Sequence, residues 1–487
     1  MNRVSIICGL AVAALLLLVH LVVGFVPVSD GAGWDGGLYV QYIQTLGQGN
    51  PILDDPYRSV RMSGFLPLIF ASALGVSKAG LIWIQLFLNV VMLSVGAALL
   101  HDTMLRLNVK KSVATISVAI LTCSWVFLCM PMFYPILSDN VALAMVCICL
   151  WCWVRSYRWA VYAFCAYFTW LMPGLFLIPL ILATFPHERS VNPEKRLVSS
   201  KLSLLLFAVV VLPASAVMLF MIYKVPLSAV VSHAASVIGK TASLDMILLS
   251  VTAMLISLSL IVWLGVRLLL DPVTWRSISF SGLLAAGLSF LVSAILIKTC
   301  IDWSGGFNGP PLLDYLFYQS LAAPFKPIIA HFISFGPVIL LAIFACLAWA
   351  FGCRHSIPKA LIVICFAFLP LLAYGSETRQ WIGVLPVAVV IFAVADFAWL
   401  TRVWCLVISA VVFAPSLWIK GYVGMAATAG LSYQSYQWQF YFGRHGPWMS
   451  MTVYQIGLIL ALGFIAVAVL LQKQAKDQIE ASVHPLI

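Results

Sequence analysis

The sequence predicts an all-α protein that crosses a membrane many times. Of its 487 residues, 63% are hydrophobic and only 9% are charged, whereas a soluble chain carries roughly 25% charged residues. Apolar runs of about 17–25 residues recur along the whole chain, which is the length that a membrane-spanning helix needs. The runs lack the alternation of apolar and polar residues that marks the strands of a membrane barrel. We therefore predict one polytopic domain over residues 1–487, with no separate soluble domain.

Spanning helices in the N-terminal part are predicted from hydropathy and oriented by charge. Arg3 precedes the first apolar run, and because Lys and Arg concentrate in the cytoplasm, the N-terminus is expected there. A long external segment then covers 28–77. The run at 160–185 is too long for one straight helix and contains Pro173 near its middle, so it predicts two shorter helices. The remaining spans of this part are expected at about 5–27, 78–100, 112–130 and 137–154.

The C-terminal part predicts eight further spans, which brings the total to about 14, within a range of 11 to 14. They are expected at about 203–222, 246–267, 277–299, 328–351, 359–374, 383–400, 402–419 and 453–472. Both termini are then cytoplasmic. The other external segments are 223–245, 300–327, 375–383 and 420–452.

Charge and cysteine content exclude some classes of function. A net charge of +11 would suggest nucleic-acid binding in a soluble protein, but basic cytoplasmic loops explain it here. Most of the twelve cysteines lie inside apolar runs, where cysteine behaves as a small hydrophobic side chain. The close pair Cys149 and Cys152 has no second pair to complete a metal site. We expect no nucleic-acid partner and no cofactor, and no metal is indicated.

The external segment at 28–77 combines carboxylates with amphipathic sequence. Asp30 and Asp35 stand just after the first apolar run, among glycines. The stretch 36–49 places apolar residues at helical spacing, which is typical of a helix lying in the membrane interface. The stretch 62–76 predicts a second, more apolar interfacial helix, and the acidic and basic sequence ILDDPYRSVR separates the two.

This arrangement resembles the first external loop of GT-C glycosyltransferases, in particular the protein mannosyltransferase and lipid A aminoarabinose transferase group. The matching sequences are WDGGLYVQYI and DDPYRSVRMSGFLPL. The matching positions are Asp35, Gly36, Tyr39, Tyr57, Arg58, Arg61 and Pro67. This chain has Trp34 where the group often has Tyr, and Gln41 and Ile43 where small residues are common.

The motif covers about 40 residues, and the helix pattern extends the resemblance over roughly 1–220, the expected GT-C-like core. Residues 221–487 match only in general architecture and are expected to form more variable helices and loops.

The resemblance implies an enzyme that uses a sugar linked to a polyprenyl phosphate. The acceptor would be a glycan, a lipid or a protein on the external face, which in a bacterium is the periplasmic face of the inner membrane. A carboxylate can take the proton of the attacking hydroxyl in a single displacement that inverts the anomeric carbon. Asp35 is the first choice for this base and Asp30 the second. The alternative is that either Asp only forms a turn beside glycine.

The leaving phosphate would need cations at the external surface. Arg58 and Arg61 would share a face if helical and could then clamp a phosphate. Alternatively, these arginines pair with Asp54 and Asp55, or their side chains extend to the membrane surface. In GT-C enzymes an arginine in a late external turn is thought to meet the lipid phosphate, and Arg379 matches it.

Several further side chains are candidates for acid chemistry or acceptor contact. Glu377 could act beside Arg379 or simply pair with it. Asp139 matches a second acidic position of GT-C enzymes, some of which bind a metal there, although capping of its helix is the simpler explanation. The candidate acceptor contacts are Tyr39, Arg444 and His445, in regions whose aromatic residues could equally form an interfacial belt.

Two other classes of membrane protein share this hydropathy. A transporter or flippase of lipid-linked glycans should carry charges near the membrane midplane and often repeats its halves, and neither feature is evident. An O-antigen polymerase or ligase typically has one large late external loop rather than an acidic first loop. Both remain alternatives to a glycosyltransferase.

Overall fold

The computed structural model describes the chain except for 51–54, 191–199, 227, 229–245, 302, 304–311, 354–356, 432–448 and 484–487. Every regular element in the described part is a helix. The chain is therefore an all-helical protein, as the sequence predicts, and its long apolar helices make it a multi-pass membrane protein.

Seven helices in the described part are long and apolar enough to cross a membrane, or nine if each of two bent pairs forms one span. The seven are α1 (Arg3–Val23), α5 (Lys78–Arg106), α12 (Ser200–Lys224), α14 (Ile247–Leu270), α16 (Phe280–Cys300), the stretch Trp399–Thr428 and α25 (Met451–Val483). Trp399–Thr428 is made of α22 (Trp399–Phe413), η7 (Ala414–Trp418) and α23 (Ile419–Thr428).

Two predicted straight spans are broken instead. The first is α6 (Lys111–Thr122), which turns by 72° into a stretch that includes α7 (Met130–Phe133). The second is α18 (Lys326–Phe335), which meets α19 (Val338–Ala350) at 120°. Gly336 lies between them with a φ of +86°, and Pro337 follows. A left-handed glycine before a proline ends one helix and redirects the chain, which explains the second break.

The other five predicted spans form shorter helices. They are α8 (Ser138–Val154), α9 (Arg158–Leu171), α10 (Leu177–Thr184), α20 (Lys359–Tyr374) and α21 (Val384–Val394). The predicted break in 160–185 is confirmed, because the 3-10 turn η4 (Pro173–Phe176) separates α9 from α10. α8 and α21 are buried along almost their whole length. Helices enclosed by protein do not need the length of a lipid-facing span.

The segment 28–77 is helical where the sequence predicts helices. It contains α2 (Trp34–Gly47), α3 (Pro56–Ser59), η2 (Met62–Phe65) and α4 (Leu66–Ala73). α2 packs on α4, and η2 packs on α8 and α9. The sequence did not predict α17 (Leu312–Leu321), which packs on α18 and α20.

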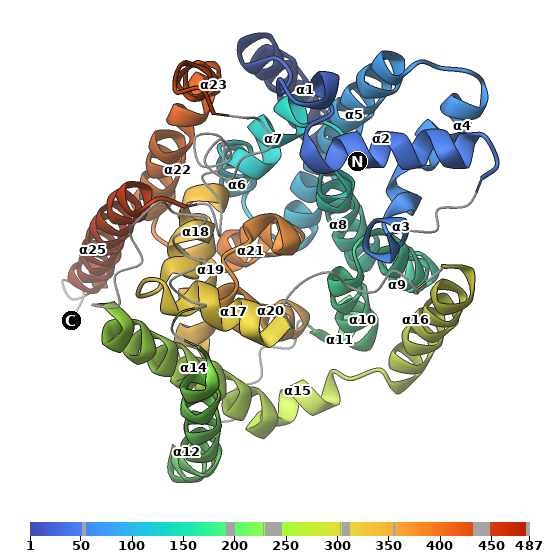
Figure 1. Ribbon diagram of the computed structural model, residues 1–487. Helices are drawn as coiled ribbons and strands as arrows, with labels where there is room; N and C mark the ends of the chain where they lie inside the picture. The colour runs from blue at the N-terminus through green and yellow to red at the C-terminus, as the bar shows by residue number, and fades with distance from the viewer. Residues whose placement is uncertain are drawn as a thin grey trace.

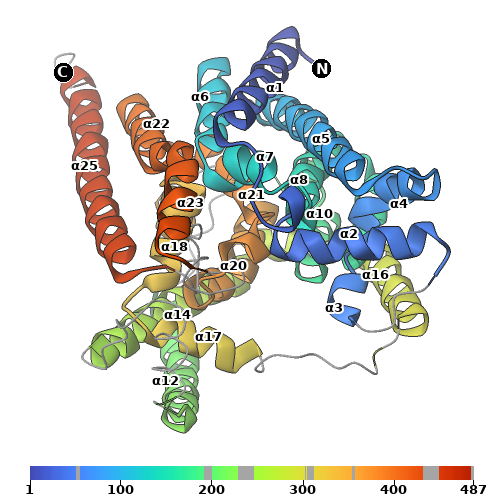
Figure 2. The same cartoon turned by 45° about the horizontal axis from the view of Figure 1, so that its top comes forward.

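Short buried helices lie at the centre and long helices surround them. α21 and α20 are central in Figure 1, with α12 and α14 at the bottom and α25 at the left. The outer helix α12 exposes Leu204, Leu205 and Leu212, as expected for a surface that faces lipid. Figure 2 shows α2 and α3 on one side of α20 and α21, with α17 and α18 on the other. The central helices therefore separate the α2–α3 side of the molecule from the α17–α18 side.

Candidate functional site

A glycine-rich turn places Asp35 in the first turn of α2. Gly31 and Gly33 have φ angles of +98° and +84°, which a residue with a Cβ adopts only with strain. A Cβ on Gly33 would also lie 2.2 Å from the ring of Tyr134. The backbone N–H of Gly36 donates to the Tyr134 hydroxyl at 3.2 Å, which fixes the start of α2 against the segment before α8. A carboxylate in this first turn is favoured by the helix dipole.

Two arginines from distant parts of the chain bind the Asp35 carboxylate. Arg58 Nη2 lies 2.7 Å from Asp35 Oδ1, and Arg379 Nη1 lies 2.9 Å from Asp35 Oδ2. The three side chains are each 22–24% exposed, so the cluster is largely but not fully withdrawn from solvent. Such charge-assisted hydrogen bonds are among the stronger polar contacts in proteins.

Each arginine is also held by a second acid. Asp55 caps α3 by accepting from the backbone N–H of Arg58, and it also accepts from the Arg58 guanidinium. Arg379 belongs to the 3-10 turn η6 (Thr378–Trp381), and its Nε lies 3.2 Å from Glu377 Oε1. Both simpler alternatives from the sequence, the pairing of Arg58 with Asp55 and of Arg379 with Glu377, therefore occur in addition to the contacts with Asp35.

The ion pairs keep Asp35 charged. Burial by itself would raise the pKa of the Asp35 carboxyl, but Arg379 and Arg58 outweigh it and hold the pKa well below its usual range. Burial opposes the charge of Arg58 in turn, yet its bonds to Asp35 and Asp55 raise its pKa above the ordinary value. The cluster therefore contains a permanent carboxylate between permanent guanidinium groups.

Arg61 differs from the other two arginines. The sequence predicted that Arg58 and Arg61 would share a face if both were helical. α3 ends at Ser59, so this condition is not met. The Arg61 guanidinium lies 4.0 Å from the centre of the Tyr57 ring, a cation–π contact. No described carboxylate lies within 4.0 Å of it. Burial raises the pKa of Tyr57 to about 12, so its hydroxyl stays neutral. Arg61 is thus a cation without an ion pair in the described part of the chain.

Asp139 and Tyr39 lie next to this cluster. Asp139 is 2% exposed in the first turn of α8, and the charges of Arg379 and Arg61 act on it. It does not cap the helix, because the capping position is Leu137. Tyr39 is buried, with its ring centre 5.0 Å from that of Phe65. Tyr39 therefore packs in the wall of the site, whereas the sequence offered it as an acceptor contact.

The other candidates are not part of the cluster. Asp30 is 85% exposed and pairs with Lys78 at 3.0 Å, so it is separate from Asp35. Arg444 and His445 lie outside the described residues. The structure brings together Asp35, Arg58, Glu377 and Arg379, with Arg61, Asp139 and Tyr39 adjoining.

Sequence reasoning missed the residues that support the segment before α8. Asn89 in α5 donates to the backbone carbonyls of Pro131 and Pro135, at 3.1 and 3.0 Å. Asn140 donates to the carbonyls of Tyr134 and Pro135, both at 3.1 Å. These amides fix Tyr134, on which α2 begins. An asparagine inside an apolar helix was the available signal, because buried amides need partners.

The described residues contain no group of three or more His, Cys, Asp or Glu side chains that could hold a metal ion. Asp35, Asp55 and Glu377 instead bind arginines. The twelve cysteines form no disulfides.

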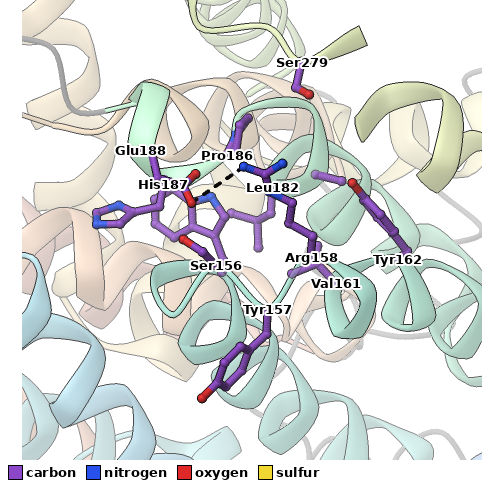
Figure 3. A pocket seen from close by; sticks show the side chains of 12 residues that line it. Ser156, Tyr157, Arg158, Val161, Tyr162, Leu182, Pro186, His187, Glu188 and Ser279 are labelled. Atoms are coloured by element: carbon purple, nitrogen blue, oxygen red, sulfur yellow. Dashed lines mark ion pairs between the residues drawn. The ribbon is translucent and has the colours of Figure 1, made fainter. Parts of the chain in front are cut away.

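A separate pocket lies near the opposite end of α8 (Figure 3). It is lined by Trp153, Tyr157 and Val161 among others, with Arg158 and Glu188 paired at 3.8 Å. α8 has 17 residues, so its two ends are about 25 Å apart. Because both charged side chains are about half exposed, this pair is a weak surface interaction. The pocket is remote from Asp35.

No family model, curated protein or solved structure matches the chain.

Proposed function

We propose that the chain is a glycosyltransferase of the GT-C type that transfers a sugar from a polyprenyl phosphate to a glycan, lipid or protein acceptor. The observation that carries this proposal is the meeting of Asp35, just after the first membrane helix, with Arg379 from the other half of the chain. The proposal includes about 14 spans and a site on the external face, which in a bacterium is the periplasmic face of the inner membrane.

Asp35 is the proposed catalytic base. A hydroxyl group is a weak nucleophile, and a carboxylate beside it can take its proton as it attacks the anomeric carbon. The same carboxylate can stabilise the positive charge that develops on the sugar. One displacement of this kind inverts the anomeric carbon.

Arrival of the donor would make Asp35 more basic. Paired with Arg58 and Arg379, this carboxylate holds a proton poorly. A lipid phosphate is a competing anion for the same guanidinium groups, and drawing them away weakens the pairs that lower the Asp35 pKa. Arg61, which lacks an ion pair among the described residues, is the cation available to receive the phosphate first. Donor binding and activation of the base are then coupled.

The decisive experiment is release of polyprenyl phosphate from a panel of labelled polyprenyl phosphate sugars by the purified full-length protein. Asp35→Asn should lower kcat by at least about 100-fold, because the proton acceptor is lost. Asp30→Asn is the matched control, since Asp30 lies in the same segment but is exposed and paired with Lys78. It should retain at least half of the activity.

Three results would count against the proposal. Normal turnover by Asp35→Asn would remove Asp35 as the base. A protein that moves intact lipid-linked glycan across the bilayer and transfers no sugar would favour the flippase alternative. A protein that joins preassembled glycan chains would favour the polymerase or ligase alternative.

A further inference from the structure

The cavity in Figure 3 is walled by three segments that lie far apart in the sequence. They are the start of α9 with the turn before it, the end of α10 with α11 (His187–Ser190), and the start of α16. The backbone N–H of Ser279 donates to the Thr184 carbonyl at 2.7 Å, which joins α16 to α10. Arg189 Nη1 donates to the Ile278 carbonyl at 3.1 Å, which joins α11 to the same turn. The predicted spans place all three segments on the cytoplasmic side of the membrane.

The segments around the cavity are basic. Their charged residues, over 153–162, 182–190 and 275–281, are one acid, Glu188, and four arginines, Arg155, Arg158, Arg189 and Arg276. Arg158 lines the cavity, and its guanidinium lies 3.8 Å from the Glu188 carboxylate. This distance exceeds that of a charge-assisted hydrogen bond, and the Arg158 side chain is 61% exposed. Glu188 therefore holds Arg158 weakly, and a stronger anion can replace it.

Aromatic side chains border the cavity and face outward. Trp159 is 83% exposed, and its ring centre lies 5.6 Å from that of Tyr162, which lines the cavity. Trp275 and Phe280, on either side of Ser279 in the sequence, are also exposed. Trp and Tyr concentrate at the level of the lipid headgroups, and basic pockets between membrane helices on the cytoplasmic side bind anionic headgroups. These side chains place the cavity beside lipid.

The size of the cavity favours a lipid over a soluble ligand. Its volume of about 20 Å³ has room for one group of the size of a water molecule. A site that encloses a soluble ligand typically holds about 300–1,000 Å³. A phosphate oxygen is about as large as a water molecule. A phospholipid needs only this contact in the cavity, because its acyl chains already hold it in the membrane.

We propose that Arg158 binds the phosphate of an anionic phospholipid in the cytoplasmic leaflet. Figure 3 shows Arg158 between Glu188 on one side and Tyr162 and Ser279 on the other. The two hydroxyl groups can donate to a phosphate oxygen and add no negative charge. The phosphate replaces Glu188 as the partner of Arg158. α8 extends about 25 Å from this end to the end that carries Asp139, so the lipid site is distinct from the cluster around Asp35.

The test compares the full-length protein in nanodiscs of phosphatidylcholine with nanodiscs that also contain phosphatidylglycerol. At saturation the anionic lipid should raise the Tm of the wild type by about 2–4 °C. Arg158→Gln should lose this shift. Arg3→Gln is the matched control, because Arg3 is also exposed and also begins a helix. It should keep the full shift.

Glu188→Gln separates lipid binding from a structural role of the ion pair. Glu188 competes with the lipid phosphate for Arg158, so its neutral replacement should reduce the proportion of phosphatidylglycerol that gives half of the shift by about 2- to 5-fold. A purely structural pair predicts otherwise: Arg158→Gln and Glu188→Gln would both lower Tm in phosphatidylcholine, and both would keep the wild-type response to phosphatidylglycerol.

Three results would overturn the lipid site. The first is a wild type that does not respond to phosphatidylglycerol, and the second is a full response in Arg158→Gln. The third is a Tm shift from inorganic phosphate in phosphatidylcholine nanodiscs that disappears in Arg158→Gln, because the ligand would then be a soluble anion. No sugar transfer is measured, so these results are independent of the proposed function.

Discussion

At the scale of single residues, the arginines around Asp35 divide into two kinds. Arg58 and Arg379 are bound by carboxylates, whereas Arg61 stacks on Tyr57 and has no described ion pair. The sequence treated Arg58 and Arg61 as equivalent. Their difference depends on where α3 ends and on which acids lie within reach, and neither is visible in residue type alone.

The ionisation of Asp35 gives a prediction about pH and stability. An unfolded Asp has a pKa of about 3.9, and the folded value of Asp35 is lower. Its ion pairs therefore contribute fully above the unfolded pKa, and the contribution is lost only as pH falls through the folded pKa. Asp35→Asn should lower the free energy of unfolding by about 1–3 kcal/mol, equally at pH 5 and pH 8.

Thermal unfolding measured from pH 5 to pH 8 tests this prediction. Asp30→Asn is the control, and it should lower the free energy of unfolding by less than about 1 kcal/mol. If the difference in the free energy of unfolding between Asp35→Asn and the wild type shrinks steadily from pH 8 to pH 5, Asp35 takes up a proton in this range.

At the scale of elements, the site depends on close contact between α2 and the segment before α8. A Cβ on Gly36 would lie 2.9 Å from the carbonyl oxygen of Ile136 and 3.1 Å from the Tyr134 ring. The helical pattern in 36–49 predicted α2, but not the surface against which it packs. α2 can pack this closely on the segment before α8 only because Gly36 has no side chain. The conformational freedom of glycine is not the reason at this position.

Gly36→Ala should therefore displace the start of α2. We expect a loss of about 1–3 kcal/mol in the free energy of unfolding, as for overpacked cores, and at least a 10-fold fall in sugar transfer as Asp35 shifts relative to Arg379. Gly463→Ala is the control, because a Cβ there meets nothing within 4 Å and alanine favours the helix. Wild-type stability and transfer in Gly36→Ala would show that this contact does not position Asp35.

At the scale of the whole molecule, the buried helices α8, α20 and α21 bring the two halves of the chain together. η6 lies between α20 and α21 and carries Arg379 toward α2. The predicted external position of this meeting point depends on the topology of the chain.

Two exposed native cysteines test that topology. Cys300 ends α16 and Cys353 follows α19. The predicted spans place Cys300 outside and Cys353 in the cytoplasm. A membrane-impermeant maleimide should label Cys300 in intact cells and reach Cys353 only after permeabilisation, with Cys300→Ser as the control. Labelling of Cys353 in intact cells would contradict the topology.

The sequence by itself determined the helical, multi-pass class and most helix positions, because long apolar runs can satisfy their backbone groups in lipid only as helices. α20 occupies 359–374 as predicted, and the break at Pro173 was visible in the residue types. Asp35 and Arg379 could be named as candidates from their places beside apolar runs together with the resemblance to GT-C enzymes.

Only the tertiary structure decided which residues meet. It separated Asp30 from Asp35, joined Asp35 to Arg379, and left Lys326 buried without a described partner. Hydropathy records the preference of each segment for lipid, not its contacts with other segments. Contacts between distant segments depend on how buried helices pack and where bends such as that at Gly336 redirect the chain.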